Sequence, residues 1–416
     1  MASLGALILA AWTGSAPLVG ARPIDDDDDG PARAQINRSP REPIIRCLHS
    51  RRRRCLAVPS YRGDPSIGHQ FGLRGRYVLR EAGAAVNRVQ IDVATRLSTK
   101  LIQNHELQLR LRELWGHGEI LQSRLAYIDD PIYPFFGVAR GERLSSEELN
   151  DPKYKLHLRS MGLQVDLQPE IVRFDRVLAN RHDPPATLHS IAGLRWAVDS
   201  IDAEPQSHVA VERPEDIGVR YRGSVIVGAS WDRRDNEWAP TLGGQHDVTA
   251  EFARPWAGAS TTFTRINASF RWFRWIGTPR LVLAQRLLYD HVLGDPPLYT
   301  LGEFGGLWPI DGLGGRYSAR GFARQRIIGA HKMASSTELR LDLFGFHLGA
   351  RHIGVGTKAF ADVGKAAVPR QRWRKNLRHS IGGGIYVVWD RFFVVRLDVG
   401  ASNEDVQWYV SSGHMF

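Results

Sequence analysis

The most regular feature of the sequence is an alternation of apolar and polar residues with a period of two. It begins near residue 66 and recurs to the end of the chain. Such alternation is typical of β-strands that turn one face to an apolar and one to a polar environment. The 3.6-residue period of an amphipathic helix is nowhere sustained, so the pattern predicts an all-β fold. The clearest stretches are residues 71–80, 88–97, 107–112, 219–232 and 395–399.

The polar side of these stretches carries arginine unusually often. In a soluble sandwich that side would face water, and the apolar side would need a second sheet to cover it. In a membrane barrel the apolar side meets lipid and the charged side faces a water-filled lumen. Strand length alone leaves both interpretations open. The arginines are Arg74, Arg76, Arg88, Arg96, Arg110, Arg112, Arg220 and Arg222.

Three observations favour the barrel. The connections Ala139–Tyr154 and Asp199–Asp216 are long and hydrophilic whereas others are tight, and the chain ends on Phe416 in a strand-like run. Tryptophans and tyrosines fall near expected strand ends, where membrane interfaces place them. We therefore predict a single transmembrane antiparallel β-barrel of about 16 strands. The aromatic residues are Trp115, Tyr127, Tyr133, Trp196, Trp231, Trp238, Trp256 and Trp408.

The first 65 residues differ from the rest. Residues 1–21 contain an apolar core and small residues suited to cleavage, which predicts a signal peptide, with a short buried strand as the alternative. Residues 22–65 predict a disordered charged linker, because Asp25–Asp29 and Arg51–Arg54 are blocks of like charge. Cys47 and Cys55 bracket the arginine block and could form a local disulfide after export. The barrel domain is then expected over residues 66–416.

Composition narrows the class of partner. The net charge of +11 and the pI of about 9.9 would suit nucleic acid or an anionic membrane. No arginine-rich helix, zinc-ligand spacing or stacking motif accompanies the charge, so we predict no nucleic-acid partner. No apolar run approaches the ~18 residues of a membrane-spanning helix.

The glycine-rich stretch Asp311–Phe322 predicts a shaped loop, because glycine allows positive φ and close backbone approach. Arg320 lies directly before the last glycine of this stretch. The alternating segments that follow turn single carboxylates, Glu338 and Asp362, to one face. Together these features indicate a loop folded inside a closed sheet.

Five segments, taken in order, resemble the barrel domain of the bacterial surface-antigen superfamily. That superfamily includes BamA-type assembly factors, TamA-type translocation factors and two-partner-secretion transporters. The resemblance covers about residues 66–416. The segments are Trp231–Asn236 with Pro240 and Gly243, Leu313–Gly315 with Ala319–Phe322, Glu338–Arg340, Phe360–Gly364, and the terminal Phe416.

The resemblance implies roles for three groups of residues. The first is a loop lock, in which Arg320 of an inward-folded extracellular loop contacts two carboxylates in the lumen. The second is a strand-and-turn motif, and the third is a C-terminal insertion signal on the lipid face of the last strand, read by the host assembly machinery. The groups are Arg320, Gly321, Phe322, Glu338 and Asp362; Asp232, Arg234, Asp235, Pro240 and Gly243; and Trp408, Val410 and Phe416.

Two departures refine the expectation. The assembly and translocation members carry polypeptide-transport-associated domains of roughly 75 residues, and residues 22–65 are too few for one. The chain therefore resembles the short, barrel-only branch. Ala319 stands where a branched residue is usual before the arginine.

No catalytic constellation is present in the sequence. The G-x-S-x-G elbow and the H-E-x-x-H pair are both missing, and the 15 histidines are scattered. We therefore expect no enzyme activity, no cofactor and no metal site.

Two functions remain open for a barrel in the bacterial outer membrane. The first is outer-membrane protein insertion or polypeptide translocation, with a polypeptide client or periplasmic partner. The alternative is a passive or gated anion-preferring channel, or a membrane anchor for a separately encoded partner. A soluble all-β binding protein is a third interpretation. Outer-membrane lipids are expected partners of either barrel.

Overall fold

The computed structural model describes residues 53–80, 87–174, 184–348, 351–367, 377–389 and 393–416. The predicted signal peptide, Cys47 and the acidic run Asp25–Asp29 lie outside these residues.

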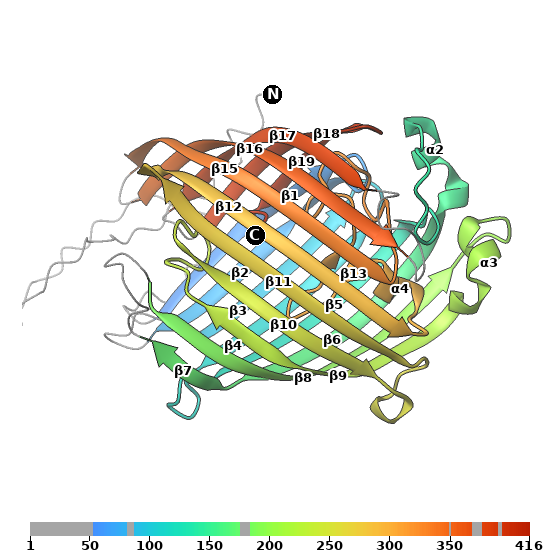
Figure 1. Ribbon diagram of the computed structural model, residues 1–416, viewed down its shortest axis with the longest axis horizontal. Coiled ribbons are helices and arrows are strands. Elements are labelled where there is room, and N and C mark those ends of the chain that lie inside the picture. The colour runs from blue at the N-terminus through green and yellow to red at the C-terminus, as the bar shows by residue number, and fades with distance from the viewer. Residues whose placement is uncertain (1–52, 81–86, 175–183, 349–350, 368–376, 390–392) are drawn as a thin grey trace, which may run out of the picture.

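The chain forms one closed antiparallel barrel of sixteen strands, as the sequence predicts (Figure 1). Each strand pairs with its sequence neighbour, and β1 closes the ring against β19. β6 and the short β7 both pair with β8 and are separated by Pro169, which cannot donate a backbone hydrogen bond. They therefore count as one of the sixteen strands. The wall strands are β1 (Arg53–Asp64), β2 (Gly68–Arg80), β3 (Asn87–Ser98), β4 (Gln103–Arg112), β5 (Ile120–Pro134), β6 (Lys155–Gln168), β7 (Glu170–Phe174), β8 (Ala186–Asp202), β9 (Gly218–Asp232), β10 (Gly243–Ala253), β11 (Phe263–Ile276), β12 (Thr278–Gly294), β15 (His331–Leu348), β16 (Arg351–Ala367), β17 (Arg378–Trp389), β18 (Phe393–Ser402) and β19 (Val406–Ser412).

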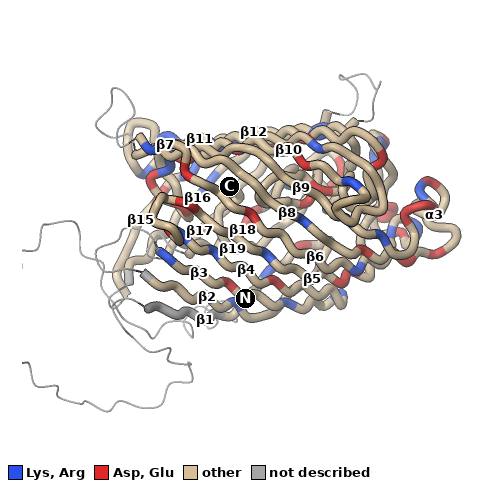
Figure 2. The backbone as a smooth tube through the Cα atoms, turned by 90° about the horizontal axis from the view of Figure 1, so that it is seen from below, with Lys and Arg blue, Asp and Glu red and all other residues tan. Residues whose placement is uncertain are grey.

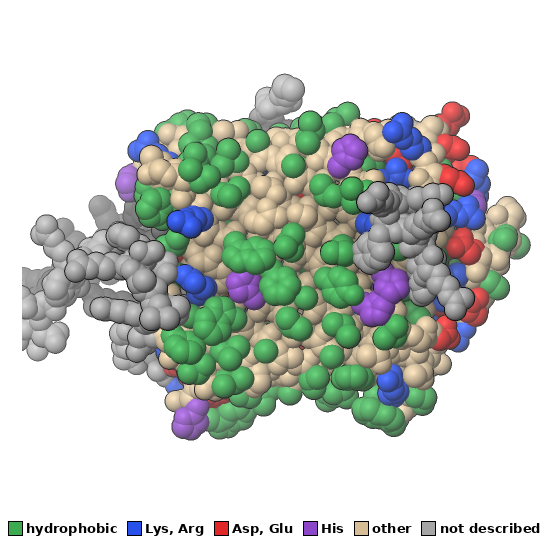
Figure 3. All heavy atoms as spheres, viewed as in Figure 1, with side chains coloured by type: hydrophobic (Ala, Val, Ile, Leu, Met, Phe, Trp, Pro, Cys, Tyr) green, Lys and Arg blue, Asp and Glu red, His purple; other side chains and the backbone are tan. Residues whose placement is uncertain are grey.

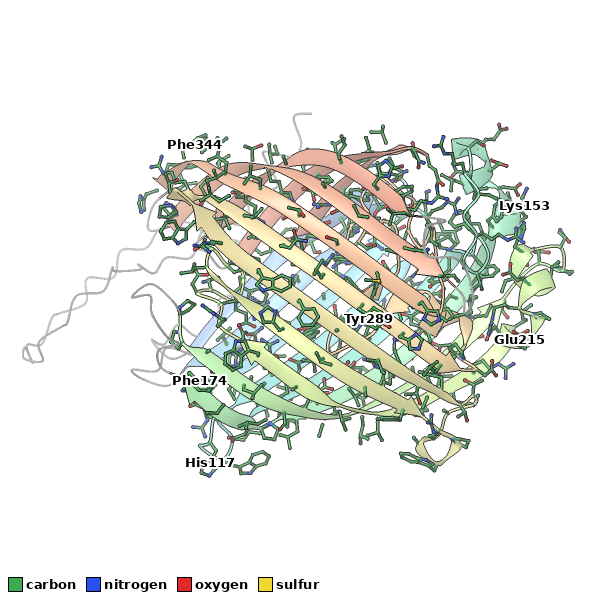
Figure 4. The ribbon with its side chains drawn as sticks, viewed as in Figure 1. His117, Lys153, Phe174, Glu215, Tyr289 and Phe344 are labelled. Carbon is green, nitrogen blue, oxygen red and sulfur yellow. The ribbon has the colours of Figure 1, made fainter. Side chains whose placement is uncertain are left out.

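The two ends of the barrel differ. Longer connections gather at one end, which we call the helical end, where α2 and α3 lie (Figure 1). Figure 4 labels Lys153 and Glu215 there, and His117, Phe174 and Phe344 at the opposite end, which we call the turn end. The remaining short elements are α2 (Ser146–Asn150), η1 (Pro152–Tyr154), α3 (His208–Glu212), η2 (Pro214–Asp216), η3 (Pro255–Ala257), α4 (Leu298–Leu301), β13 (Glu303–Phe304) and β14 (Ile310–Asp311).

The outer wall is apolar and the inner wall is charged. Phe71, Leu73 and Leu194 are more than half exposed on the outside, whereas Arg96 and Asp166 are buried inside. Hydrophobic side chains cover much of the wall in Figure 3, and charged ones gather at the helical end. Figure 2 shows acidic and basic positions spread along the strands. An apolar exterior on a wall of tilted strands is the surface that lipid would cover. Among the described helices, none is both long and apolar enough for a membrane crossing.

The barrel begins earlier than predicted. β1 spans Arg53–Asp64 and pairs with β2 over its whole length, so the predicted linker 22–65 ends at least twelve residues too late. The sequence predicts a linker here because Arg51–Arg54 is a block of like charge. β1 also contains Pro59, which it tolerates because most of its other edge has no partner strand in the described chain.

Several smaller predictions were wrong. Asp199 lies in β8, which continues to Asp202, so that connection is shorter than expected. Trp196 lies in the middle of β8 and Tyr127 in the middle of β5 rather than at strand ends, and Trp238 lies inside the barrel against Arg76. Tyr133 is buried inside the helical end, where it packs in a cluster with Leu298 of the connection between β12 and β15. Aromatic type alone does not distinguish an interface position from an internal one.

Candidate functional site

The connection from β12 to β15, residues 295–330, folds into the barrel instead of standing outside it. We call it the inner loop. Its glycine-rich part is almost wholly buried, and Leu313 and Phe304 pack with Leu288 of the wall. Gly314 and Gly321 adopt positive φ of 109° and 95°, as the sequence led us to expect of a shaped loop.

Arg320 of the inner loop contacts the wall through three carboxylates. Its Nε and Nη2 donate to the two oxygens of Asp362 at 2.8 and 3.0 Å, and its backbone N–H donates to Asp362 Oδ2 at 3.1 Å. Nη1 lies 2.5 Å from Glu338 Oε1 and 3.3 Å from Asp398 Oδ2. All four side chains are fully buried. The structure thus brings together the three ionic residues assigned to the loop lock.

The electrostatics of this cluster hold Arg320 in its charged form. Burial alone would lower the pKa of Arg320, but the charges of Asp362 and Glu338 outweigh it and raise the pKa. The guanidinium also lies 3.4 Å from the centre of the Phe360 ring, a cation–π contact.

The cluster contains four ionic residues that the loop-lock assignment missed. One is Arg340, which lies 2.8 Å from Glu338 Oε2. Asp398 and Lys358 join the cluster by an ion pair at 3.0 Å, and Lys358 Nζ also lies 3.0 Å from Glu338 Oε1. Arg396 pairs with Asp398 two residues away on β18. The alternation of residues 395–399 predicts that Arg396 and Asp398 lie on the polar face, but it does not predict their contact with the loop lock.

Gly321 and Phe322 attach the inner loop to the last two strands. A Cβ on Gly321 would lie 2.9 Å from the Ala401 backbone, so no larger residue fits without movement. The Gly321 N–H donates to the Tyr409 hydroxyl at 2.9 Å, and its carbonyl accepts from Ser402 Oγ at 2.7 Å. Phe322 is 2% exposed. The five loop-lock residues therefore fasten the inner loop to β15, β16, β18 and β19.

A second arginine of the inner loop lies across the seam between β1 and β19. Arg316 forms an ion pair with Asp64, at the end of β1, and lies 3.5 Å from Ser411 Oγ of β19. On the outside, Trp408 covers Gly63, where a Cβ would lie 2.8 Å from the indole ring. Both faces of the seam are thus held near the helical end.

Elsewhere the seam is barely paired. Among the described residues, Gly63 and Val410 form the only register pair between β1 and β19, whereas β1 and β2 share twelve. The reason is geometric, since β19 ends at Ser412 while β1 extends back to Arg53. The backbone edge of β1 toward the turn end therefore has no partner strand in the part of the chain that the structure describes.

The residues of the strand-and-turn motif shape the connection from β9 to β10. Asp232 accepts from the Arg234 backbone and guanidinium, and Asp235 Oδ1 accepts from the backbone N–H groups of Thr241 and Leu242 at 2.8 and 3.0 Å. Pro240 is buried beside this turn, and Gly243 closes it with φ of 94°.

The tip of this turn, residues 237–239, crosses the lumen at the turn end. Glu237 pairs with Arg110 and Arg112 of β4, and Trp238 lies under the guanidinium of Arg76 at 4.1 Å. Ala239 packs with Tyr386 and Val394 on the far wall. Burial would raise the pKa of Glu237, but the two arginines lower it to about 2. We call residues 233–242 the lumen turn.

One residue of the predicted C-terminal signal lies elsewhere. Trp408 and Val410 alternate with the buried Gln407 and Tyr409, so they face outward. Phe416 does not share that face, contrary to expectation. Gly413, with φ of 81°, ends the strand and turns the chain into the lumen.

Phe416 lies among the charged and aromatic residues of the inner wall. Its ring is 4.9 Å from the Arg286 guanidinium and 5.3 Å from that of Arg340, and its centre is 6.2 Å from that of Phe273. The lumen is therefore occupied at three levels, by the inner loop, the lumen turn and residues 414–416.

No group of three or more histidine, cysteine or carboxylate side chains in the described part of the chain is arranged to hold a metal ion.

These features define a closed β-barrel with an apolar outer wall, an arginine-locked inner loop and a weakly paired seam. The model of the Omp85 superfamily domain matches residues 185–416, more than half of the chain, and the chain belongs to this superfamily. A search of curated proteins returned no sequence match.

Two solved structures are similar in fold. One is BamA from Haemophilus ducreyi lacking POTRA domains 1–3, with a TM-score of 0.53 and 13% identity over 86% of this chain and 70% of that one. The other is CdiB from Escherichia coli, with a TM-score of 0.56 and 16% identity over 88% of this chain and 64% of that one. At these identities the likeness concerns the fold.

Proposed function

We propose that this protein inserts or translocates polypeptides across the bacterial outer membrane, with the seam between β1 and β19 as its working site. The role is non-catalytic, and its partners are outer-membrane lipids, the host assembly machinery and a polypeptide client. Membership of the Omp85 superfamily and the apolar outer wall support this location and role.

The observation that carries the proposal is the unpaired edge of β1. A strand edge with free N–H and C=O groups is a template for another strand, and an added strand gains main-chain hydrogen bonds along its length. Among the described residues, the edge of β1 has no partner strand toward the turn end. Near the helical end it is closed by the Gly63–Val410 pair and by Arg316. A client strand would therefore enter from the turn end.

Closing the seam covalently should block this activity. The native cysteines are first replaced by Cys47→Ser and Cys55→Ser, and Tyr61→Cys and Ser412→Cys are then introduced. These two positions face each other if the antiparallel pairing of Gly63 with Val410 continues for two more residues. Paired Cα atoms in antiparallel strands lie about 4.5–5.5 Å apart, which suits a disulfide. Oxidation is expected to stop insertion of a urea-unfolded eight-stranded barrel into proteoliposomes, and reduction to restore it.

The matched control places a cysteine pair between ordinary wall strands. Phe71→Cys and Leu97→Cys pair in register on β2 and β3 and face outward. Oxidising this pair should leave insertion unchanged. If the oxidised seam variant inserts the client as fast as the reduced one, the seam is not the working site.

A second candidate, an anion-preferring channel, is favoured by the inner wall. Arg286 is 4% exposed, and among the described residues its guanidinium contacts backbone oxygens and the Phe416 ring rather than a carboxylate. Any current through the lumen should then prefer anions. Reversal potentials in a salt gradient test this, and a cation preference would contradict it.

A further inference from the structure

Two arginines on the inner wall beside the seam, Arg62 and Arg96, form no ion pair with a carboxylate among the described residues. Arg96 of β3 is 3% exposed, yet its hydrogen bonds go to neutral atoms, Ser60 Oγ at 3.2 Å and Asn104 Oδ1 at 3.4 Å. Gly72 of β2 pairs with Ser60 on one side and Arg96 on the other, so no side chain separates them. Among the described residues, Arg96 forms no ion pair.

Arg62 lies one inward position further along β1 than Ser60. Its Nε is buried and has no hydrogen-bond partner in the described chain. Like Arg96, it forms no ion pair with a described carboxylate. Two neighbouring guanidinium groups without a counter-charge are costly to bury, because each loses hydration and repels the other.

Tyr317 of the inner loop directly follows Arg316, which lies at the seam. Burial would raise the pKa of Tyr317, but Arg62, Arg316 and Arg96 outweigh it and lower the pKa, so positive charges surround this hydroxyl. Arg316 is neutralised by Asp64. Among the described residues, Arg62 and Arg96 remain without an ion-paired carboxylate, because Glu106, the nearby carboxylate, is paired with Arg124.

We propose that Arg62, Arg96 and the Tyr317 hydroxyl form a binding site for an oxyanion inside the lumen, next to the seam. Planar guanidinium groups with free N–H donors match the oxygens of phosphate or carboxylate, and charge-assisted hydrogen bonds to them are the strong kind. The site does not depend on the proposed handling of polypeptides. The oxyanion could be dissolved phosphate or the carboxylates of this chain's own Asp25–Asp29 run, which lies outside the described residues.

Titration of the full chain with inorganic phosphate tests the site. The protein in detergent micelles at low salt is expected to bind phosphate by calorimetry and to unfold at a higher temperature in its presence. The double variant Arg62→Gln with Arg96→Gln should lose both responses. The control Arg271→Gln removes an inner-wall arginine of β11, across the barrel from the seam, that is paired with Asp247 at 3.7 Å, and it should keep both responses.

Tyr317→Phe keeps the test decisive if the double variant fails to fold, since it removes only a hydroxyl and should weaken phosphate binding. No phosphate response in the wild-type protein, or an undiminished one in the folded variants, would overturn the proposal. Replacing Asp25–Asp29 by asparagine identifies the source. A stronger phosphate response in that variant means that the acidic run competes for the site, and an equal response means that the dissolved ion is the ligand.

Discussion

Replacing Arg320 by alanine is expected to cause the largest loss of folded barrel of any single substitution in the inner loop. The change leaves Glu338 and Asp362 buried without their shared partner, at 0% exposure. Removing one member of a buried ionic group costs about 3–5 kcal/mol. The folded fraction can be measured by heat-modifiable migration on a gel, and stability by the unfolding temperature of the purified protein.

Asp362→Ala should behave similarly, and the double variant should be little worse than either single one, because the two residues act as a unit. Arg159→Ala is the control, since Arg159 and its partner Asp202 are about half exposed and should contribute little. Additive losses, or a loss in Arg159→Ala as large as that in Arg320→Ala, would contradict a loop lock.

Releasing the lumen turn should open the turn end of the barrel. Glu237→Gln removes the charge that Arg110 and Arg112 hold across the lumen, and Trp238→Ala removes the ring beneath Arg76. Each variant is expected to show larger and more frequent current steps than the wild-type protein in planar bilayers, because the crossing segment loses its far attachment.

Glu170→Gln is the matched control for this prediction. Glu170 is an ion-paired carboxylate at the same end, but its partner Arg173 lies three residues away on the same strand. Its loss should leave the current steps unchanged. Wild-type conductance in both Glu237→Gln and Trp238→Ala would mean that the lumen turn is no obstruction.

Periodicity was enough to predict the wall and the direction of its side chains. An outward Leu339 or Val363 fixes the adjacent Glu338 or Asp362 as inward, whatever the register between strands. The resemblance then placed Arg320 beside them. The contact between Asp398 and Lys358 was harder to predict, because it depends on how three strands are paired. Gly384 of β17 pairs with both residues and has no side chain to separate them.

Three features were not predicted correctly: the position of Phe416, the direction of the lumen turn and the presence of β1. The outward assignment of Phe416 assumed that the strand period continues, and a single positive φ at Gly413 ends it. The lumen turn was assigned correctly as a turn in the sequence, but its direction depends on partners in β2, β4 and β17 that are distant in the sequence. β1 was missed because the like-charge block Arg51–Arg54 predicts a linker, whereas pairing with β2 at twelve positions makes the segment a strand.

The short final strand has a consequence for the surrounding bilayer. β19 has seven residues, which span about 23 Å at 3.3 Å per residue even without tilt, against a hydrocarbon thickness of about 30 Å. Its neighbours β18 and β1 have 10 and 12 residues. Acyl chains beside β19 must therefore shorten or disorder to avoid exposure, a local hydrophobic mismatch. The barrel would thin the membrane at one position on its circumference. That position is the seam, where the edge of β1 has no partner strand among the described residues.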